Sequence, residues 1–239
     1  MPKKIPLNLC LLFGLLFAFP AQAATPAIAK LGIADTMLQL AVEPTPAAST
    51  ITLKDLPPGF RELPPEISAA LSSRLDLLSQ QIGQENLKPE NFFAFVNPQD
   101  FQIVFGFTNK IPSQPQQASF DASMQQLSKP EVQKQMLTQL QERVKLLGEI
   151  KVTDYRSLPG LTDIANVSTG ITIGLETRGQ PLRIDIAAFR RDATGGFTGV
   201  MYPLDKQPTV GVGDVARKLD GRIGQLPAAS PNPTTNSPK

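Results

Sequence analysis

The stretch ITIGLETRGQPLRIDIAAF, residues 171–189, holds two apolar runs separated by a turn-forming cluster at residues 177–181. The second run alternates apolar with charged side chains, Leu182, Ile184 and Ile186 against Arg183 and Asp185. A period of two residues is typical of a strand that buries one of its faces. The stretch therefore predicts two antiparallel strands joined by a short turn.

Further strand-like runs lie on both sides of this pair. They are rich in aromatic and β-branched residues, and turn-forming residues separate them. A turn at residues 192–196 leads into the run at 197–202, and a four-residue turn at 97–100 joins another two runs. The predicted strands outside the first pair are residues 92–96, 101–107, 150–155 and 197–202. Consecutive strands with short turns predict an antiparallel meander.

Helical periodicity separates these strands. Apolar residues recur at steps of three and four in three segments, residues 67–82, 131–147 and 212–226, and residues 121–127 add one or two turns. The order of helix, two strands, helix, several strands and helix indicates an α+β fold. We expect one domain over residues 51–226, an antiparallel sheet of about five to seven strands flanked by helices in an α/β/α sandwich.

A proline-rich stretch, LPPGFRELPP at residues 56–65, lies near the start of this domain. We expect a short strand before it, at Ile51–Leu53, and a helix after it. Proline pairs can form polyproline ligands for other proteins. Here their position between two elements favours a rigid corner, with Phe60 held in the core.

The N-terminus has the layout of a secretory signal peptide. Lys3 and Lys4 precede an apolar run at Leu9–Phe19, and Ala21–Ala23 has the small residues of a cleavage site. The apolar run is shorter than the roughly 20 residues that span a bilayer. We therefore expect residues 1–23 to be a signal peptide cleaved after Ala23, with export to a periplasm, a thylakoid lumen or the extracellular space.

The remaining parts of the chain flank the domain. Cys10, the only cysteine, lies inside the apolar run without a small residue just before it, so we expect no lipid anchor. Residues 24–50 are rich in alanine and proline, which predicts a linker. Residues 227–239 hold prolines among small polar residues and predict a disordered tail.

Missing residue types exclude several mechanisms. The chain has no histidine and no tryptophan, and signal cleavage would remove its cysteine. A Ser-His-Asp triad, a cysteine nucleophile and a zinc site of imidazole or thiolate ligands are then impossible. Without Lys3 and Lys4 the basic and acidic residues balance at 21 each, which gives no support for nucleic-acid binding. We expect a protein that is not an enzyme and that has no metal and no cofactor.

Charged residues on and after the strand at 182–189 form the candidate binding face. Arg183 and Asp185 would share one face about 7 Å apart, since a strand rises ~3.3 Å per residue. Together with Arg190 and Arg191 they suggest a surface for anions or carboxylates, because guanidinium groups pair well with both. The alternative is a solvated sheet face whose charges pair across strands.

The run from Leu158 to Ile223 opens with LPGLTDIAN and closes with GDVARKLDGRI. In its order of elements it resembles a broad class of secreted bacterial domains. The class includes PsbP-like proteins, among them photosystem II accessory subunits, and extracytoplasmic sensor domains of bacterial kinases. Pro58–Phe60 is similar to the proline-glycine-aromatic opening of PsbP-like domains. The resemblance implies a helix–sheet–helix sandwich that binds a partner, while the metal-binding histidines of some PsbP proteins have no counterpart here.

These observations leave three hypotheses for function. The first is an exported accessory protein that binds a protein partner, such as a membrane complex or an envelope protein. The second is a carrier or sensor of a small amphiphilic ligand, held between a helix and the phenylalanines of residues 92–107. The third is a hydrolase that uses carboxylates such as Glu176, Asp185 and Asp192.

Overall fold

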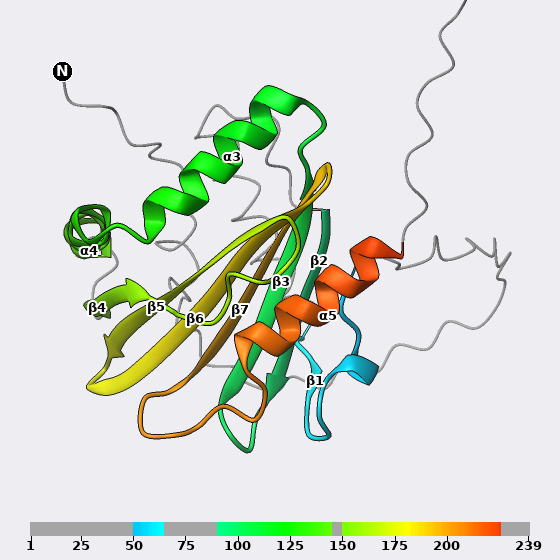
Figure 1. Cartoon of the computed structure of the whole chain (residues 1–239). Helices are drawn as coiled ribbons and strands as arrows, with labels where there is room; N and C mark the ends of the chain where they lie inside the picture. The colour runs from blue at the N-terminus through cyan, green and yellow to red at the C-terminus, as the bar shows by residue number, and fades with distance from the viewer. Residues whose placement is uncertain (1–49, 65–89, 145–149, 226–239) are drawn as a thin grey trace, which may run out of the picture.

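The computed structural model describes residues 50–64, 90–144 and 150–225, and within them the chain forms one antiparallel sheet with helices on both faces (Figure 1). The strand order is β1-β2-β3-β7-β6-β5-β4. The predicted α+β class, an antiparallel sheet flanked by helices, is confirmed. The elements are the 3₁₀ helix Leu53–Asp55, β1 (Arg61–Glu62), β2 (Glu90–Asn97), β3 (Gln102–Lys110), α3 (Gln114–Leu127), α4 (Pro130–Val144), β4 (Ile150–Ser157), β5 (Val167–Thr177), β6 (Gln180–Arg191), β7 (Thr194–Pro203) and α5 (Val212–Gly224).

The stretch at residues 171–189 forms the hairpin of β5 and β6. Ile173 pairs with Ile184 across the two strands. Arg178 and Gly179 both have a positive φ, 50° and 77°, as a two-residue hairpin turn with the right-handed twist of its strands requires. Both strands extend beyond the predicted runs, and the meander continues from β6 into β7.

The turn predicted at residues 192–196 is shorter in the structure. Asp192 and Ala193 make the turn, while Gly195 and Gly196 already lie in β7. The glycines are needed for packing instead: a Cβ at Gly196 would lie 2.3 Å from Cζ of Phe189, whose ring covers it. A glycine in a strand can therefore mark a close approach of an aromatic ring and not a turn.

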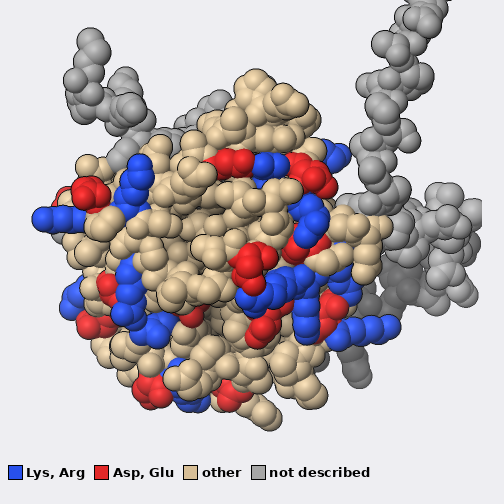
Figure 2. All heavy atoms as spheres, viewed as in Figure 1, with Lys and Arg blue, Asp and Glu red and all other residues tan. Residues whose placement is uncertain are grey.

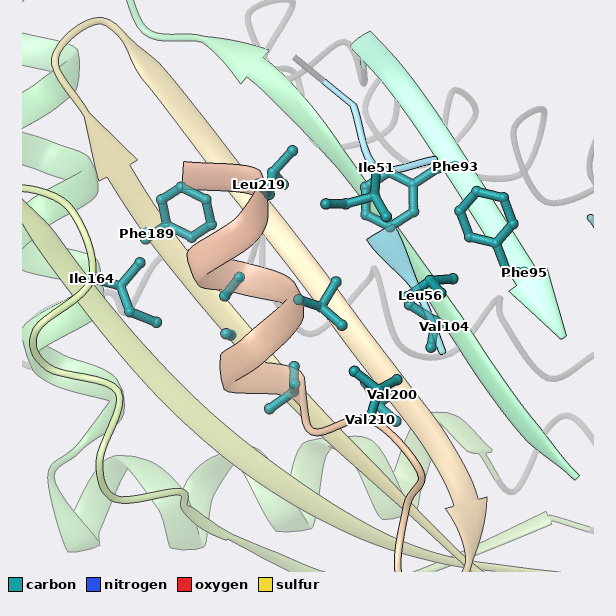
Figure 3. Packing of buried hydrophobic residues seen from close by; sticks show 14 of the residues in the cluster. Ile51, Leu56, Phe93, Phe95, Val104, Ile164, Phe189, Val200, Val210 and Leu219 are labelled. Atoms are coloured by element: carbon teal, nitrogen blue, oxygen red, sulfur yellow. The ribbon is translucent and has the colours of Figure 1, made fainter. Parts of the chain in front are cut away.

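Two buried clusters lie on the two faces of the sheet. On one face, α3 and α4 pack over β4 and β5, where Met136 and Leu140 contact side chains such as Ile173. On the other face, α5 packs against β6 and β7. Figure 3 shows this second cluster, to which α5 contributes Leu219 and the sheet contributes Phe189 and Val200. Both faces of β6 are thus partly covered by helices.

The helix predicted at 212–226 appears as α5, which ends at Gly224, and α3 contains its predicted segment and is longer. Residues 121–127 were expected to give one or two turns, but α3 begins at Gln114 because Ser113 and Gln116 form a reciprocal cap. The predicted helix at 131–147 appears as α4 up to Val144, and its last residues lie outside the described ranges. The helix predicted at 67–82 also lies outside the described residues.

The segment before the proline-rich stretch is not a strand, so that prediction is wrong. Leu53–Asp55 forms a 3₁₀ helix, because Asp55 Oδ2 accepts hydrogen bonds from both the N–H and the hydroxyl of Thr52, at 2.7 and 2.8 Å. The chain then turns at Gly59, which has a φ of 102°. Phe60 packs against the buried cluster beneath α5, as the corner interpretation expects, and β1 follows directly as a short edge strand that the sequence did not predict.

Candidate functional site

One part of the α5 face of the sheet is polar. Helix α5 packs mainly against β6 and β7, and Leu161 of the β4–β5 loop covers the start of β5 at Gly170. Charged side chains of both signs lie on the area that these elements leave open (Figure 2). We call this area the polar sheet patch, and it consists of Lys151, Asp154, Arg156, Thr172, Glu176, Arg183, Asp185 and Tyr202.

Asp185 is the centre of the polar sheet patch. On β6, Asp185 lies opposite Thr172 of β5. Two residues earlier on the same strand, Arg183 lies opposite Tyr202 of β7. The hydroxyl of Thr172 donates to Asp185 Oδ1 at 2.6 Å, and the hydroxyl of Tyr202 donates to Asp185 Oδ2 at 2.7 Å. Three adjacent strands are thus connected by one carboxylate.

The phenol of Tyr202 is held in its neutral, hydrogen-bond-donating form. The pKa of Tyr202 is raised to about 12, first by burial and then by the hydrogen bond to Asp185 and the charge of that carboxylate. The Arg183 guanidinium partly opposes this rise in pKa. Tyr202 is only 5% exposed, so its hydroxyl is fixed in place beneath the surface that Arg183 and Asp185 present.

The edge strand β4 adds two exposed ion pairs to the polar sheet patch. Lys151 Nζ lies 3.1 Å from Glu176 Oε1, and Arg156 Nε lies 3.2 Å from Asp154 Oδ2. The side chain of Arg156 is 54% exposed and that of Asp154 is 46% exposed. Exposed ion pairs of this kind contribute about 0–1 kcal/mol to stability. These side chains can therefore exchange their present ion-pair partners for groups of a binding protein with little loss of stability.

The four residues of the predicted binding face are divided by the structure. Arg183 and Asp185 share the polar sheet patch, as the two-residue period indicated. Arg190 lies on the other face of the sheet and pairs with Asp121 of α3, while Arg191 pairs with Asp220 of α5. Hydrogen bonds to these carboxylates raise the pKa of both guanidinium groups. Arg190 and Arg191 therefore attach helices to the sheet.

Residues that the sequence did not single out complete the site. Thr172 and Tyr202 hold Asp185 from the two neighbouring strands, and Arg156 lies opposite Thr172 on β4. Their participation depends on strand register, which the alternation within one strand does not reveal. In the sequence, Tyr202 is only the aromatic last residue of a predicted strand. Nothing in that strand indicates that its hydroxyl would lie against a carboxylate.

The carboxylates of the hydrolase hypothesis are not brought together. Glu176 and Asp185 face the same side of the sheet, but Glu176 lies four residues along β5 from Thr172, the partner of Asp185. This spacing corresponds to about 13 Å. Asp192 lies at the opposite end of β6, in the turn to β7. A carboxylate pair for glycoside hydrolysis needs a separation of about 5–10 Å.

The phenylalanines behind the small-ligand hypothesis have packing roles. Phe93, Phe95 and Phe107 of the β2–β3 hairpin are each 5% exposed and belong to the buried clusters. Within residues 50–64, 90–144 and 150–225, no group of three or more His, Cys, Asp or Glu residues could hold a metal ion. No helix in those same ranges has the length and apolar character needed to cross a bilayer.

Comparison with known proteins adds no family to these observations. No known family matches the chain, and no curated protein matches it significantly. The fold class and the geometry of the polar sheet patch are therefore the basis for the function proposed below.

Proposed function

We propose that this chain is an exported, non-enzymatic accessory protein that binds a protein partner through the polar sheet patch. In this proposal residues 1–23 direct export to a periplasm or a thylakoid lumen, and the partner is a membrane complex or another envelope protein. The PsbP-like layout of the sequence belongs to the same proposal. It supports a binding role, because the accessory proteins and sensor domains of that class act by binding.

The observation that carries the proposal is the fixed arrangement of Arg183, Asp185 and Tyr202 on an open area of sheet. The carboxylate of Asp185 is already held by two hydrogen bonds and offers an ordered acceptor, and the guanidinium of Arg183 two residues away on the same face adds donors. Groups that are ordered before binding lose less entropy when a partner docks. Arginine and tyrosine are also enriched among the residues that dominate protein interfaces.

The charges of the polar sheet patch favour a protein partner. Three basic residues, Lys151, Arg156 and Arg183, alternate with three acidic ones, Asp154, Glu176 and Asp185. A nucleic acid or another polyanion would be repelled by the carboxylates. A protein surface can supply both signs in register, and such complementarity gives specificity more than raw affinity.

The test is an affinity capture from mildly solubilised host membranes with the exported protein as bait. Arg183→Glu reverses the charge beside Asp185 and should reduce recovery of the specific partner at least tenfold. Lys134→Glu is the matched control, because Lys134 is an exposed lysine of α4 on the other side of the sheet. It should leave recovery unchanged.

Thermal unfolding of both variants separates binding from folding, since each should melt within a few degrees of the natural protein. Equal recovery with Arg183→Glu and Lys134→Glu would contradict a role for the polar sheet patch. Failure of the natural protein to enrich anything above a bait-free control would remove the binding proposal itself.

A further inference from the structure

Two exposed apolar side chains stand at one end of the sheet. Among the described residues, the large hydrophobic side chains that are exposed are Leu53, Phe101 and Leu204, at 39%, 69% and 45%. Phe101 lies in the β2–β3 turn and Leu204 in the β7–α5 loop, and both connections lie at the lower end of the sheet in Figure 1. Lys206 of the same loop places its ammonium 5.5 Å from the centre of the Phe101 ring. We call Phe101, Leu204 and Lys206 the apolar tip.

Folding alone gives no reason for a phenylalanine at position 101. Its φ is 53°, in the left-handed region that glycine, asparagine and aspartate adopt more easily than a bulky side chain does. Its ring is also more than two-thirds exposed, so it adds little to the core. Both the backbone conformation and the exposure are unfavourable for this residue type, and such outliers often mark a functional position.

The apolar tip is held rigidly by buried polar side chains. Gln102, fully buried, donates to the carbonyl of Val210 at 2.8 Å and accepts from the N–H of Thr209 at 2.9 Å. Asn97, 2% exposed, accepts from the N–H of Gln99 at 3.1 Å and donates to Asp100 Oδ2 at 2.9 Å. The β2–β3 turn and the β7–α5 loop are therefore joined into one unit that presents Phe101 outward.

The chemistry of this unit suits the headgroup region of a lipid bilayer. Pro98, Pro203 and Pro208 have no N–H group, and the internal hydrogen bonds satisfy further donors, so fewer backbone groups would lose water on insertion. A ring and an aliphatic side chain beside charges of both signs, Lys206 and the exposed Asp205, match the boundary between lipid tails and zwitterionic headgroups. The side chains project outward from two turns. The headgroup region of a bilayer is fluid, so it can accommodate projecting side chains without a complementary pocket.

We propose that the apolar tip contacts the surface of a lipid bilayer, inserting Phe101 and Leu204 between the headgroups while Lys206 pairs with lipid phosphates. Only two apolar side chains take part, so the contact is weak and reversible. It orients the sheet on the membrane. This inference is independent of the partner-binding proposal, which concerns a different surface.

A tryptophan reporter tests the contact directly, because the chain contains no tryptophan. The exported protein with Phe101→Trp is mixed with protein-free vesicles of phosphatidylcholine. We expect a blue shift of the emission and protection from an aqueous quencher. Leu53→Trp is the matched control, because Leu53 is also exposed but lies on the 3₁₀ helix whose Asp55 pairs with Arg222 of α5. It should show no shift.

Co-sedimentation with the same vesicles completes the test without a reporter. Phe101→Ser and Lys206→Glu should each lower the bound fraction several-fold, and circular dichroism should show that both variants fold. An equal emission shift at positions 53 and 101, or unchanged sedimentation of Phe101→Ser, would overturn the proposal. A shift of Phe101→Trp that occurs with native membranes and not with protein-free vesicles would also overturn it, in favour of a protein pocket.

Discussion

Arg190 and Arg191 are consecutive in β6, yet each binds a helix on a different face of the sheet. Arg190 donates from Nε and Nη2 to the two carboxylate oxygens of Asp121 in α3, at 2.8 and 2.6 Å. Arg191 makes the same two-pronged contact with Asp220 of α5, with 2.6 Å between Nη2 and Oδ2. Because successive side chains of a strand point to opposite faces, two adjacent arginines fix both outer layers to one strand.

The Arg191–Asp220 pair should contribute measurably to stability. Asp220 is 9% exposed, and Asp220→Asn would leave the guanidinium of Arg191 without its charged partner. We expect the free energy of unfolding to fall by about 1.5–3 kcal/mol, the range for hydrogen bonds to charged groups. Chemical denaturation at neutral pH measures this change.

Glu176→Gln is the control for this prediction. It removes an ion pair with Lys151 whose two side chains are 37% and 75% exposed, and we expect a change below about 1 kcal/mol. If the two substitutions had equal effects, the contact between Arg191 and Asp220 would be no more than a surface pair.

Two glycine-to-alanine substitutions should act in opposite directions. A Cβ at Gly196 would lie 2.3 Å from Cζ of Phe189, a fully buried ring that has no room to move, so Gly196→Ala should destabilise the fold by about 1–3 kcal/mol or more. Gly221 lies in α5, and a Cβ there would meet nothing within 4 Å. Gly221→Ala should stabilise the protein by about 0.5–1 kcal/mol, because alanine favours the helix.

Thermal unfolding of both glycine variants under one set of conditions measures these differences. A gain in melting temperature for Gly196→Ala would show that the ring of Phe189 does not lie on Gly196.

Asp55 should make stability depend on pH in acid. Burial alone would raise its pKa, but hydrogen bonds from Arg222 and Thr52 and the charge of Arg222 lower it on balance below its usual 3.8. A carboxyl with a lower pKa in the folded state stabilises the fold above its unfolded pKa, and this contribution is lost as the pH falls through the folded pKa. We therefore expect Asp55→Asn to be less stable at pH 7 and to lose less stability below about pH 4.

Denaturant unfolding of the natural protein and of Asp55→Asn between pH 2 and 7 checks this prediction. Parallel stability curves over that whole range would contradict it, because they would mean that Asp55 titrates alike in the folded and unfolded chain.

Much of the fold could be predicted because each strand carries its own signal. The alternation in residues 182–186 identifies β6 as a strand without reference to any other segment. β1 could not be found, because Arg61–Glu62 is a two-residue polar strand that exists only through its pairing with β2. The start of α3 was missed because its first turns are polar and depend on the cap at Ser113.

The candidate site could be predicted only in part, since it depends on which residues face each other across strands. Arg183 and Asp185 share a face through their spacing alone, and this was visible in the sequence. The contact of Asp185 with Tyr202 depends on the register of β6 and β7, and the separation of Arg190 from Arg191 depends on where α3 and α5 carry a carboxylate. Neither the register of two strands nor the position of a carboxylate on a distant helix can be read from the sequence of one segment.

The contact between Tyr202 and Asp185 leads to a prediction in alkaline solution. The pKa of Tyr202 is raised to about 12, firstly by burial and then by Asp185. In the unfolded chain a tyrosine ionises near pH 10. The folded state thus holds the proton more tightly, so the stabilisation is complete below about pH 10 and is lost as the pH rises from there through about 12.

Absorbance at 295 nm follows this ionisation, and the chain has two tyrosines, Tyr155 and Tyr202. The difference between the natural protein and Tyr202→Phe isolates the titration of Tyr202, which should have its midpoint near pH 12 if the protein stays folded. Asp185→Asn should lower that midpoint only in part, because burial is the larger cause. In Asp185→Asn the midpoint of the Tyr202 titration should remain above pH 10. A midpoint of pH 10 in the natural protein would show that the hydroxyl of Tyr202 is solvated and does not hold Asp185.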